Sequence, residues 1–338
     1  MTFSSPPNIE RKIHSILKVL SASEKPAGSL VIAKQLKDHG VDLSERAVRY
    51  HLRLTDERGL TQLVRERDGR IITAKGRHEI ESALVNDKMG LSISRIERLA
   101  YKTSIDLEKR RGLVPVNVSF FPADKFAAAL EVMAPVFEKG FCVSRLAFAA
   151  PGGQKIGDLT VPEGAIGLAS VCSIVVNGAL LKAGIPMDSR FGGILQIQNH
   201  KPIRFTDMIH YNGSSLDPSE IFIKARMTSV REAVSSGEGK VLANFREIPA
   251  ICQPLAERVV SELRQAGFHG VLVTGEVSNA VCEVHVNQNE IGIVLLGGLN
   301  PVAAAAEAGI EAENRSMSTL VDYSTLVPFE EIRKEVKA

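Results

Sequence analysis

The stretch from Ser44 to Leu60, SERAVRYHLRLTDERGL, constrains the fold more than any other part of the chain. Ser44 is a favoured helix N-cap, because its hydroxyl can accept a hydrogen bond from a backbone N–H one turn into the helix. Gly59 is typical of a helix end. Apolar residues recur at helical spacing on one face: Ala47, Val48, Leu52 and Leu54. The opposite face carries Arg46, Arg49, Tyr50 and Arg53. The stretch therefore predicts an amphipathic helix with one basic face.

The flanking segments place this helix in a known order of elements. Two shorter amphipathic helices are predicted upstream, over residues 9–22 and 30–39. Downstream, residues 63–67 alternate like a strand, Asp68-Gly69 is a two-residue hairpin turn, and residues 70–73 form the returning strand. A closing helix is expected over 76–85. Three helices followed by a hairpin are the pattern of a winged helix-turn-helix, which we assign to residues 8–85.

The basic face predicts a nucleic-acid partner. Guanidinium groups match guanine edges and phosphates, so the face suits the major groove of an operator in double-stranded DNA. The candidate DNA contacts are Arg46, Arg49, Tyr50 and Arg53 on the helix, and Arg65, Arg67 and Arg70 on the wing. Two alternatives remain open: a solvated basic face on an ordinary helix, and a winged helix that docks RNA or a protein partner.

The distribution of charge separates the chain into two parts. Residues 1–112 hold 22 Lys and Arg against 15 Asp and Glu, whereas the remainder holds 19 against 24. A basic N-terminal part joined to an acidic remainder fits a nucleic-acid-binding module fused to a domain of another kind. It does not fit a protein that wraps DNA with its whole surface.

Several sequence signals are absent. The N-terminus has no apolar signal core, and the most apolar run, residues 291–310, is interrupted by Asn300, Pro301 and Glu307. We expect a cytoplasmic protein with no membrane partner. The four cysteines lie far apart, so neither disulfides nor a metal site is predicted. Cys282 and His285 fall in VCEVHV, a predicted strand on which residues three apart face opposite sides.

Residues 86–112 are predicted to form a charged connecting helix, with Leu91, Ile96, Leu99 and Leu107 as apolar anchors. Such a helix could pass a rotation from one domain to the other, or it could be an inert spacer. Beyond it, the composition predicts an α/β (α+β) domain over residues 113–332. Its elements include a strand at 114–121, a helix at 123–139 and an apolar β-like run at 166–176.

This second domain contains an internal repeat, with copies at about 113–234 and 240–332. At an offset of 125 residues, Ile166-Gly167 falls on Ile291-Gly292, and Ala183-Gly184-Ile185 falls on Ala308-Gly309-Ile310. Arg190 likewise falls on Arg315. Two copies of one α/β unit often enclose a ligand cleft, because clefts favour domain interfaces.

Over almost its whole length the sequence resembles the NrpR family of nitrogen-responsive transcriptional repressors. The most family-like stretch is ASVCSIVVNGALLKAGIPMDSRFGGILQI, residues 169–197, and SRIERLAYKTSIDLEKRRGLVPVNVSFF resembles the approach to the family's regulatory domain. The resemblance implies a homodimeric repressor that leaves the DNA of nitrogen-assimilation genes when the small-molecule effector 2-oxoglutarate binds. It implies no cofactor. Some members carry two tandem regulatory domains, whereas this chain carries one.

A dicarboxylate effector needs cationic groups or N–H donors in a partly closed pocket. The candidates are Cys172, Ser173, Asn177, Arg190, Gly192, Gly193 and Arg315. Arg190 is expected to bind a carboxylate, together with Arg315 from the second copy. The alternative is that both arginines make structural salt bridges, one per copy. Cys172 could equally be a buried hydrophobic residue, and Asn177 a helix cap. No catalytic residues stand out, so an enzyme with an appended winged helix is the rival interpretation.

Overall fold

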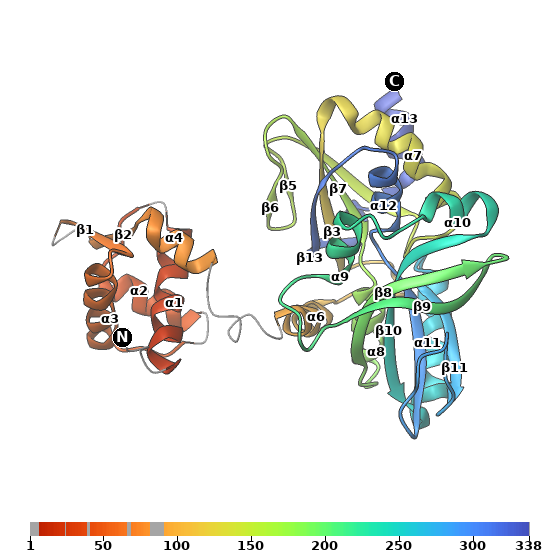
Figure 1. The fold of residues 1–338 in the computed structure, drawn as a ribbon, viewed down its shortest axis with the longest axis horizontal. Coiled ribbons are helices and arrows are strands. Elements are labelled where there is room, and N and C mark those ends of the chain that lie inside the picture. Colours follow the sequence, from red (N-terminus) through yellow and green to blue (C-terminus); the bar gives the residue numbers. More distant parts are fainter. Residues whose placement is uncertain (1–6, 24, 39–40, 66–68, 82–90, 338) are drawn as a thin grey trace. The chain divides into compact units, whose positions relative to one another are not determined.

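The computed structural model describes residues 7–23, 25–38, 41–65, 69–81 and 91–337 (Figure 1). The chain divides into two compact units, Met1–Lys88 and Met89–Ala338. No helix among the described residues is both long and apolar enough to cross a membrane.

The first unit is a winged helix. Its elements are α1 (Pro7–Ala22), α2 (Ser29–Asp38), α3 (Glu45–Glu57), β1 (Thr61–Arg65), β2 (Gly69–Ile72) and α4 (Ala74–Glu81). The N-cap of α3 is confirmed, because the Ser44 hydroxyl accepts from the Ala47 amide. The predicted apolar faces of the first two helices are also confirmed: Ile13, Ile16, Leu17, Leu20, Ile32 and Leu36 are buried. On α3 the buried face is Val48, His51, Leu52 and Thr55, so Ala47 and Leu54 lie nearer its margin than expected.

The predicted helix over residues 86–112 is wrong at its C-terminal end. Residues 82–90 lie outside the described part of the chain, and α6 (Leu91–Lys102) stops ten residues early. Thr103 closes it by donating a hydrogen bond from its hydroxyl to the Leu99 carbonyl. The backbones of Asp106 and Arg111 then pair across a tight turn. This turn replaces the end of the predicted helix and leads into the first strand of the second unit.

The second unit contains two five-stranded sheets, and neighbouring strands within each of them pair antiparallel. One sheet has the order β13-β3-β7-β4-β14. Its strands are β13 (Glu313–Asp322), β3 (Leu113–Pro122), β7 (Ala165–Val171), β4 (Leu146–Pro151) and β14 (Val327–Pro328). The other sheet has the order β11-β12-β10-β8-β9. Its strands are β11 (Val271–Val277), β12 (Glu290–Leu296), β10 (Gly239–Pro249), β8 (Asp188–Gln198) and β9 (Lys201–His210).

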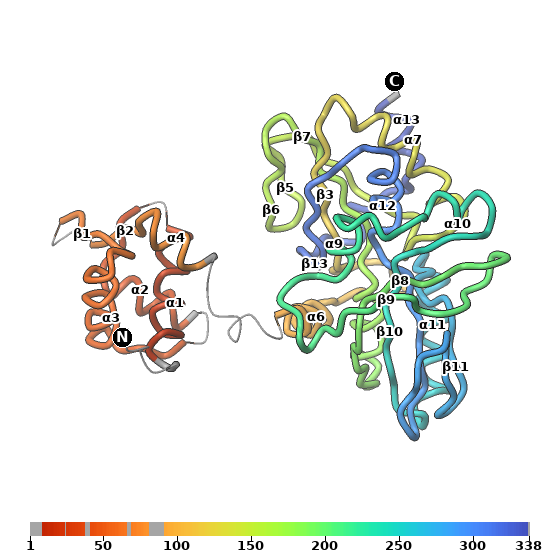
Figure 2. The backbone as a smooth tube through the Cα atoms, viewed as in Figure 1, coloured from red at the N-terminus to blue at the C-terminus, as the bar shows by residue number. Residues whose placement is uncertain are grey.

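The order of elements in this unit repeats, and the two halves exchange a strand. The first half runs β3, α7 (Phe126–Glu138), β4, β7, α8 (Ile174–Lys182) and β8; the second runs β10, α11 (Gln253–Gln265), β11, β12, α12 (Asn300–Glu307) and β13. β8 leaves the sheet of its own half and pairs with β10, while β13 pairs with β3. Figure 2 shows this crossing, with the green β8 beside the blue-green β10. The first few residues of β8 and of β13 therefore lie at the junction of the halves.

Other helices and a small hairpin complete the unit. They are β5 (Lys155–Ile156), β6 (Leu159–Thr160), α9 (Pro218–Lys224), α10 (Val230–Ser236) and α13 (Phe329–Lys337). Single 3-10 turns, Ala123–Lys125, Ala250–Cys252 and Tyr323–Thr325, follow β3, β10 and β13. One apolar core includes residues of α7, α10, α12 and α13, and a second includes residues of α8 and α11.

Two sequence-based assignments in this unit are wrong. The apolar run 166–176 is not all strand, because α8 begins at Ile174. VCEVHV is not a strand either: Val281 and Val284 pair with each other across a tight turn at which Cys282 and Glu283 have φ of 50° and 60°. β9, α9 and α10 were not predicted at all, and two of these elements lead directly into the site described next.

Candidate functional site

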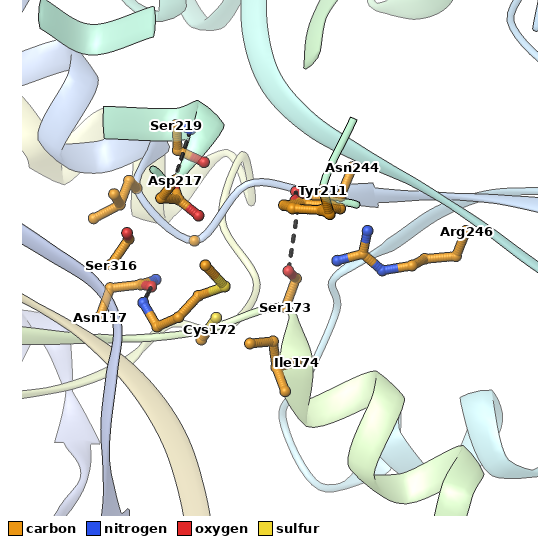
Figure 3. A pocket seen from close by; sticks show the side chains of 13 residues that line it. Asn117, Cys172, Ser173, Ile174, Tyr211, Asp217, Ser219, Asn244, Arg246 and Ser316 are labelled. Carbon is orange, nitrogen blue, oxygen red and sulfur yellow. Dashed lines mark hydrogen bonds between the residues drawn. The ribbon is translucent and has the colours of Figure 1, made fainter. Parts of the chain in front are cut away.

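An enclosed polar cavity lies between the two halves of the second unit. The first half contributes Asn117, Cys172, Ser173, Ile174, Tyr211, Asp217 and Ser219, and the second contributes Asn244, Arg246, Gly298, Leu299, Ser316 and Met317 (Figure 3). Asn117 and Asn244 occupy matching positions on β3 and β10, five residues before the proline that ends each strand. The centre of a water-sized sphere can move through about 20 Å³ of this cavity. That is room for about one water molecule.

Arg246 is the cationic group of this cavity. It is 1% exposed, and its Nη1 donates to the Phe245 carbonyl at 3.3 Å. Its guanidinium carbon lies 4.9 Å from the centre of the Tyr211 ring. Its Nε has no hydrogen-bond partner, and no acidic residue in the described parts of the chain forms an ion pair with it. A buried charge without a counter-ion is costly, so this arrangement favours an anion that enters from outside.

A chain of neutral hydrogen bonds surrounds the guanidinium. The Tyr211 hydroxyl donates to the Asn244 Oδ1 at 2.5 Å, and the Asn244 Nδ2 donates to the Ser173 Oγ at 3.2 Å. Burial raises the pKa of the Tyr211 phenol to about 12, so the phenol is neutral and remains a donor near pH 7. The three groups come from both halves of the unit, and they hold the walls of the cavity together next to Arg246.

Asp217 lies on the other side of the cavity from Arg246 (Figure 3). It is the N-cap of α9, where its Oδ1 accepts from the Ser219 amide at 2.8 Å and from the Glu220 amide at 3.3 Å. Burial, and to a smaller extent the nearby Glu220 carboxylate, raises the pKa of this carboxyl group to about 6. The cavity thus has a permanently cationic end and an end whose charge changes near neutral pH.

Cys172 and Ser173, two of the predicted effector contacts, line this cavity. Burial raises the pKa of the Cys172 thiol to about 12, so the thiol stays protonated and inert at neutral pH. Its role as a ligand contact stays a prediction. Tyr211, Asp217, Asn244 and Arg246 were not predicted from the sequence. Charged residues inside the mostly apolar strand VLANFREI were the available signal for Arg246.

Arg190 does not line the cavity. Its guanidinium pairs with Glu247 of β10 and, at 3.8 Å, with Asp188. Glu247 is 1% exposed and also accepts from the backbone and side-chain nitrogens of Asn287, at 3.1 and 2.8 Å. Arg190 is therefore the counter-ion of a buried carboxylate, which is the structural alternative that the sequence left open. Arg315 is not next to it: that residue pairs with Glu313 at 2.6 Å and lines an adjoining, more open hollow.

The remaining predicted effector residues also lie outside the cavity. Asn177 is inside α8, where its Nδ2 donates to the Ser189 Oγ at 3.0 Å. A Cβ on Gly192 would lie 2.9 Å from the Tyr211 hydroxyl and from Pro218, so this glycine permits the close packing of the cavity wall. A Cβ on Gly193 would lie 2.6 Å from the carbonyl of Asp207 on β9. Both glycines therefore serve packing between elements.

On the winged helix, α3 presents the predicted basic face to solvent. Four residues of this face are exposed: Arg46, Arg49, Tyr50 and Arg53. Arg49 forms an ion pair at 2.9 Å with Glu45, one turn earlier on the helix. Such an exposed pair is weak and easily exchanged for a phosphate. On the wing, Arg65 is exposed and Arg67 lies outside the described residues. Arg70 differs from expectation, because its Nε pairs with Asp56 at 2.7 Å and ties β2 to α3.

Comparisons with known proteins cover both units. Residues 89–328 match the family model described as NrpR regulatory domains NRD1 and 2, and residues 14–80 match that of the ribonuclease R winged-helix domain. The first match spans well over half of the chain. The chain belongs to the NrpR family. No three His, Cys, Asp or Glu residues in the described ranges are grouped so as to hold a metal ion.

Relatives within the NrpR family differ in length. The chain is 40% identical to the global nitrogen regulator NrpRI of Methanosarcina mazei, over 95% of this chain and 98% of that protein. It is 32% identical to the global nitrogen regulator NrpR of Methanococcus maripaludis, over 92% of this chain but 54% of that protein. It also resembles the crystal structure of a nitrogen repressor-like protein from Methanococcus jannaschii, with a TM-score of 0.60, 27% identity, and coverage of 71% of this chain and 98% of that one.

Proposed function

We propose that this NrpR protein is a cytoplasmic, homodimeric, non-enzymatic repressor of nitrogen-assimilation genes that 2-oxoglutarate releases from DNA. The family match and the curated relatives named as global nitrogen regulators support the regulatory role. The exposed basic face of α3 supports duplex DNA as the target. A dimer would place two such helices on half-sites one helical turn, about 34 Å, or a multiple of it apart.

The observation that carries the effector half of the proposal is the buried guanidinium of Arg246. In the cavity, an Arg246 without a counter-ion would take one carboxylate of 2-oxoglutarate, and Tyr211, Asn244 and Ser173 would offer neutral hydrogen bonds beside it. Replacing water around a buried cation with a fixed carboxylate is favourable when the geometry allows paired hydrogen bonds. Cys172 would then serve as apolar wall.

The helix that follows the winged helix packs directly on this cavity. The buried residues Ile96, Leu99 and Ala100 of α6 belong to the same apolar cluster as Cys172, Ile174, Tyr211 and Met317, which all line the cavity. Ser92 anchors the start of the helix by donating from its hydroxyl to the Leu216 carbonyl at 2.9 Å. Because the cavity has room for about one water molecule, an effector the size of 2-oxoglutarate must separate its walls. We propose that α6 moves with them.

This coupling has a thermodynamic condition. The effector shifts the protein away from DNA only if it binds the opened, DNA-incompetent state better than the closed one. In the dimer, this movement of α6 would change the spacing of the paired winged helices and so weaken binding to the two half-sites.

For DNA binding, we predict that Arg53→Ala weakens binding to the operator by about 1–3 kcal/mol if Arg53 reads a base edge. A phosphate contact would instead weaken operator and random duplex alike and lower the salt dependence of binding. Fluorescence anisotropy over a series of salt concentrations separates the two. Tyr50 and the exposed residues Arg46 and Arg49 are scanned in the same way. Unchanged binding by a variant removes that residue from the interface.

For the effector, we predict that Arg246→Gln retains operator binding and loses its response to 2-oxoglutarate. Losing one partner of a buried charge-assisted pair costs roughly 2–5 kcal/mol, so the affinity for 2-oxoglutarate should fall by about 30-fold or more. Calorimetry measures that affinity, and anisotropy at fixed salt with millimolar 2-oxoglutarate measures release from DNA. Arg315→Gln is the matched control, because Arg315 is an exposed arginine outside the cavity. Equal loss in both variants would contradict the site.

Two rival functions give different results in these assays. Similar affinity for structured RNA and for duplex DNA would favour an RNA-binding role, which the match to a ribonuclease R winged helix makes worth measuring. Turnover of a small metabolite would favour an enzyme. Specific binding to the gene's own upstream DNA that weakens with 2-oxoglutarate, but not with succinate, supports the proposed function against both.

A further inference from the structure

We infer that Asp217 is a specificity-determining residue of the cavity between the two halves: its carboxyl group, opposite Arg246, selects the charge at the second end of the ligand. The inference rests on the proposed function, in which Arg246 takes the first carboxylate. It adds that 2-oxoglutarate binds together with a proton, whereas a ligand with an ammonium group binds without one.

The geometry gives Asp217 two separate tasks. Its Oδ1 accepts both backbone hydrogen bonds that cap α9, which leaves Oδ2 out of the cap. The side chain is 6% exposed and lines the cavity. Figure 3 places it across the cavity from Arg246, with Cys172 and Ser316 on its side and Tyr211 toward the arginine. A small ligand that pairs with Arg246 would therefore extend toward this carboxyl group.

The charges around Asp217 come from several elements. Glu220, on the same helix, is the neighbour whose charge opposes ionisation of Asp217. The charge of Asp217 in turn raises the pKa of Tyr211 and of Cys172, whereas the charge of Arg246 lowers both. The adjoining hollow, which shares Asp217, Ser316 and Met317 with the cavity, adds charged residues from α6, α9 and β13: Arg95, Arg98, Lys224, Glu313 and Arg315. Burial nevertheless dominates, and it raises the pKa of Asp217 to about 6.

Which ligand Asp217 favours depends on whether its carboxyl group is protonated. A neutral Asp217 can donate a hydrogen bond to a carboxylate or to an oxo oxygen. An ionised Asp217 repels a second carboxylate and attracts an ammonium group. A dianion such as 2-oxoglutarate should raise the pKa of Asp217 further and take up a proton from solution as it binds. Its amino analogue, L-glutamate, could instead place its ammonium group against the ionised carboxylate.

The test uses Asp217→Asn in the full-length protein. Asparagine caps a helix as well as aspartate does, so the variant keeps the Oδ1 acceptor of the α9 cap and removes only the charge. Asp217→Ser, which also caps helices, is the second variant if the first one fails to fold. Isothermal calorimetry measures the affinity for 2-oxoglutarate and for L-glutamate between about pH 5.5 and 8, in two buffers with different ionisation enthalpies.

We expect the affinity of the wild type for 2-oxoglutarate to fall by up to about tenfold per pH unit above pH 6, with proton uptake on binding. The uncharged variants should show neither effect, and at pH 8 they should bind 2-oxoglutarate more tightly and L-glutamate more weakly than the wild type does. The same pH dependence in wild type and variants would overturn the inference while leaving the effector site intact. No binding of 2-oxoglutarate by the wild type at any pH would overturn the proposed effector, and the inference with it.

Discussion

The two halves of the second unit share a scaffold but differ in the residues that meet at their junction. On β3, the strand carries Asn117 and, two residues later, Ser119; on β10 the matching positions are Asn244 and Arg246. Residues two apart on a strand share a face, so both pairs face the same way relative to their sheets. The Ser119 hydroxyl donates to Asn314 within the first sheet, whereas Arg246 has no acidic partner among the described residues. The two halves thus contribute matching asparagines to the cavity, and β10 adds a cationic residue at the position where β3 carries a serine.

The strands that the halves exchange differ in a complementary way. Arg190 near the start of β8 neutralises the buried Glu247, and the matching Arg315 of β13 pairs with the exposed Glu313. Phe120 stands on β3 where β10 carries Glu247, so Arg315 meets no buried carboxylate at the position that matches Glu247. The two arginines at matching positions therefore contribute unequally to stability, because one pairs with a buried carboxylate and the other with an exposed one.

Among the variants that test this comparison, Arg190→Gln is expected to lower the free energy of unfolding the most. It leaves Glu247 buried with Asn287 as its remaining hydrogen-bond donor among the described residues, and removing one member of a buried pair costs about 3–5 kcal/mol. Because Arg190 is 29% exposed, water can reach part of the pair, and we expect about 3 kcal/mol. Urea unfolding followed by circular dichroism measures the loss in the free energy of unfolding.

Arg315→Gln is the control within the other half. Its guanidinium is 60% exposed and its partner Glu313 is 57% exposed, so the pair contributes less than about 1 kcal/mol. The two variants make the same chemical change at matching positions of one repeat. Similar losses for both would mean that the burial of Glu247 does not distinguish the two arginines.

Local signals predicted much of the fold, because they act over a few residues. The cap at Ser44 and the apolar spacing of Ile13, Ile16 and Leu17 depend only on helical periodicity, and both were confirmed. The wrong assignments arise where tertiary contacts override such patterns. Ile174 to Val176 are β-branched and apolar, yet they open α8, where all three are buried. VCEVHV alternates like a strand but turns back on itself.

The candidate site was predicted only in part, for a physical reason. The cleft between two copies followed from the repeat, and Cys172 and Ser173 followed from the family-like stretch. Tyr211 and Asp217 come from the ends of segments that carry no regular pattern, and they reach the cavity because β9 and α9 fold back against β8. Arg190 was predicted as an effector contact because it is a cationic residue close to two glycines. The sequence could not reveal that Glu247 pairs with it across the junction of the halves.

At Arg246 we expect a smaller change in the free energy of unfolding, and of the opposite sign. A buried guanidinium without a counter-ion destabilises the ligand-free protein, and methionine has a similar length without the charge. The variant Arg246→Met loses the contact with the Tyr211 ring, which is worth up to about 2 kcal/mol when buried. It also removes the cost of burying a charge, which is larger than that loss. We therefore expect the free energy of unfolding to rise by about 1 kcal/mol.

Urea unfolding of wild type and variant, without and with 2-oxoglutarate, measures this change in the free energy of unfolding. The effector should stabilise the wild type and leave the variant unchanged, since it binds only a site that retains the cation. A loss of stability in Arg246→Met would mean that Arg246 is part of the packing, as Arg190 is. A gain would mean that the second half retains the charge at a cost in stability because the ligand requires it.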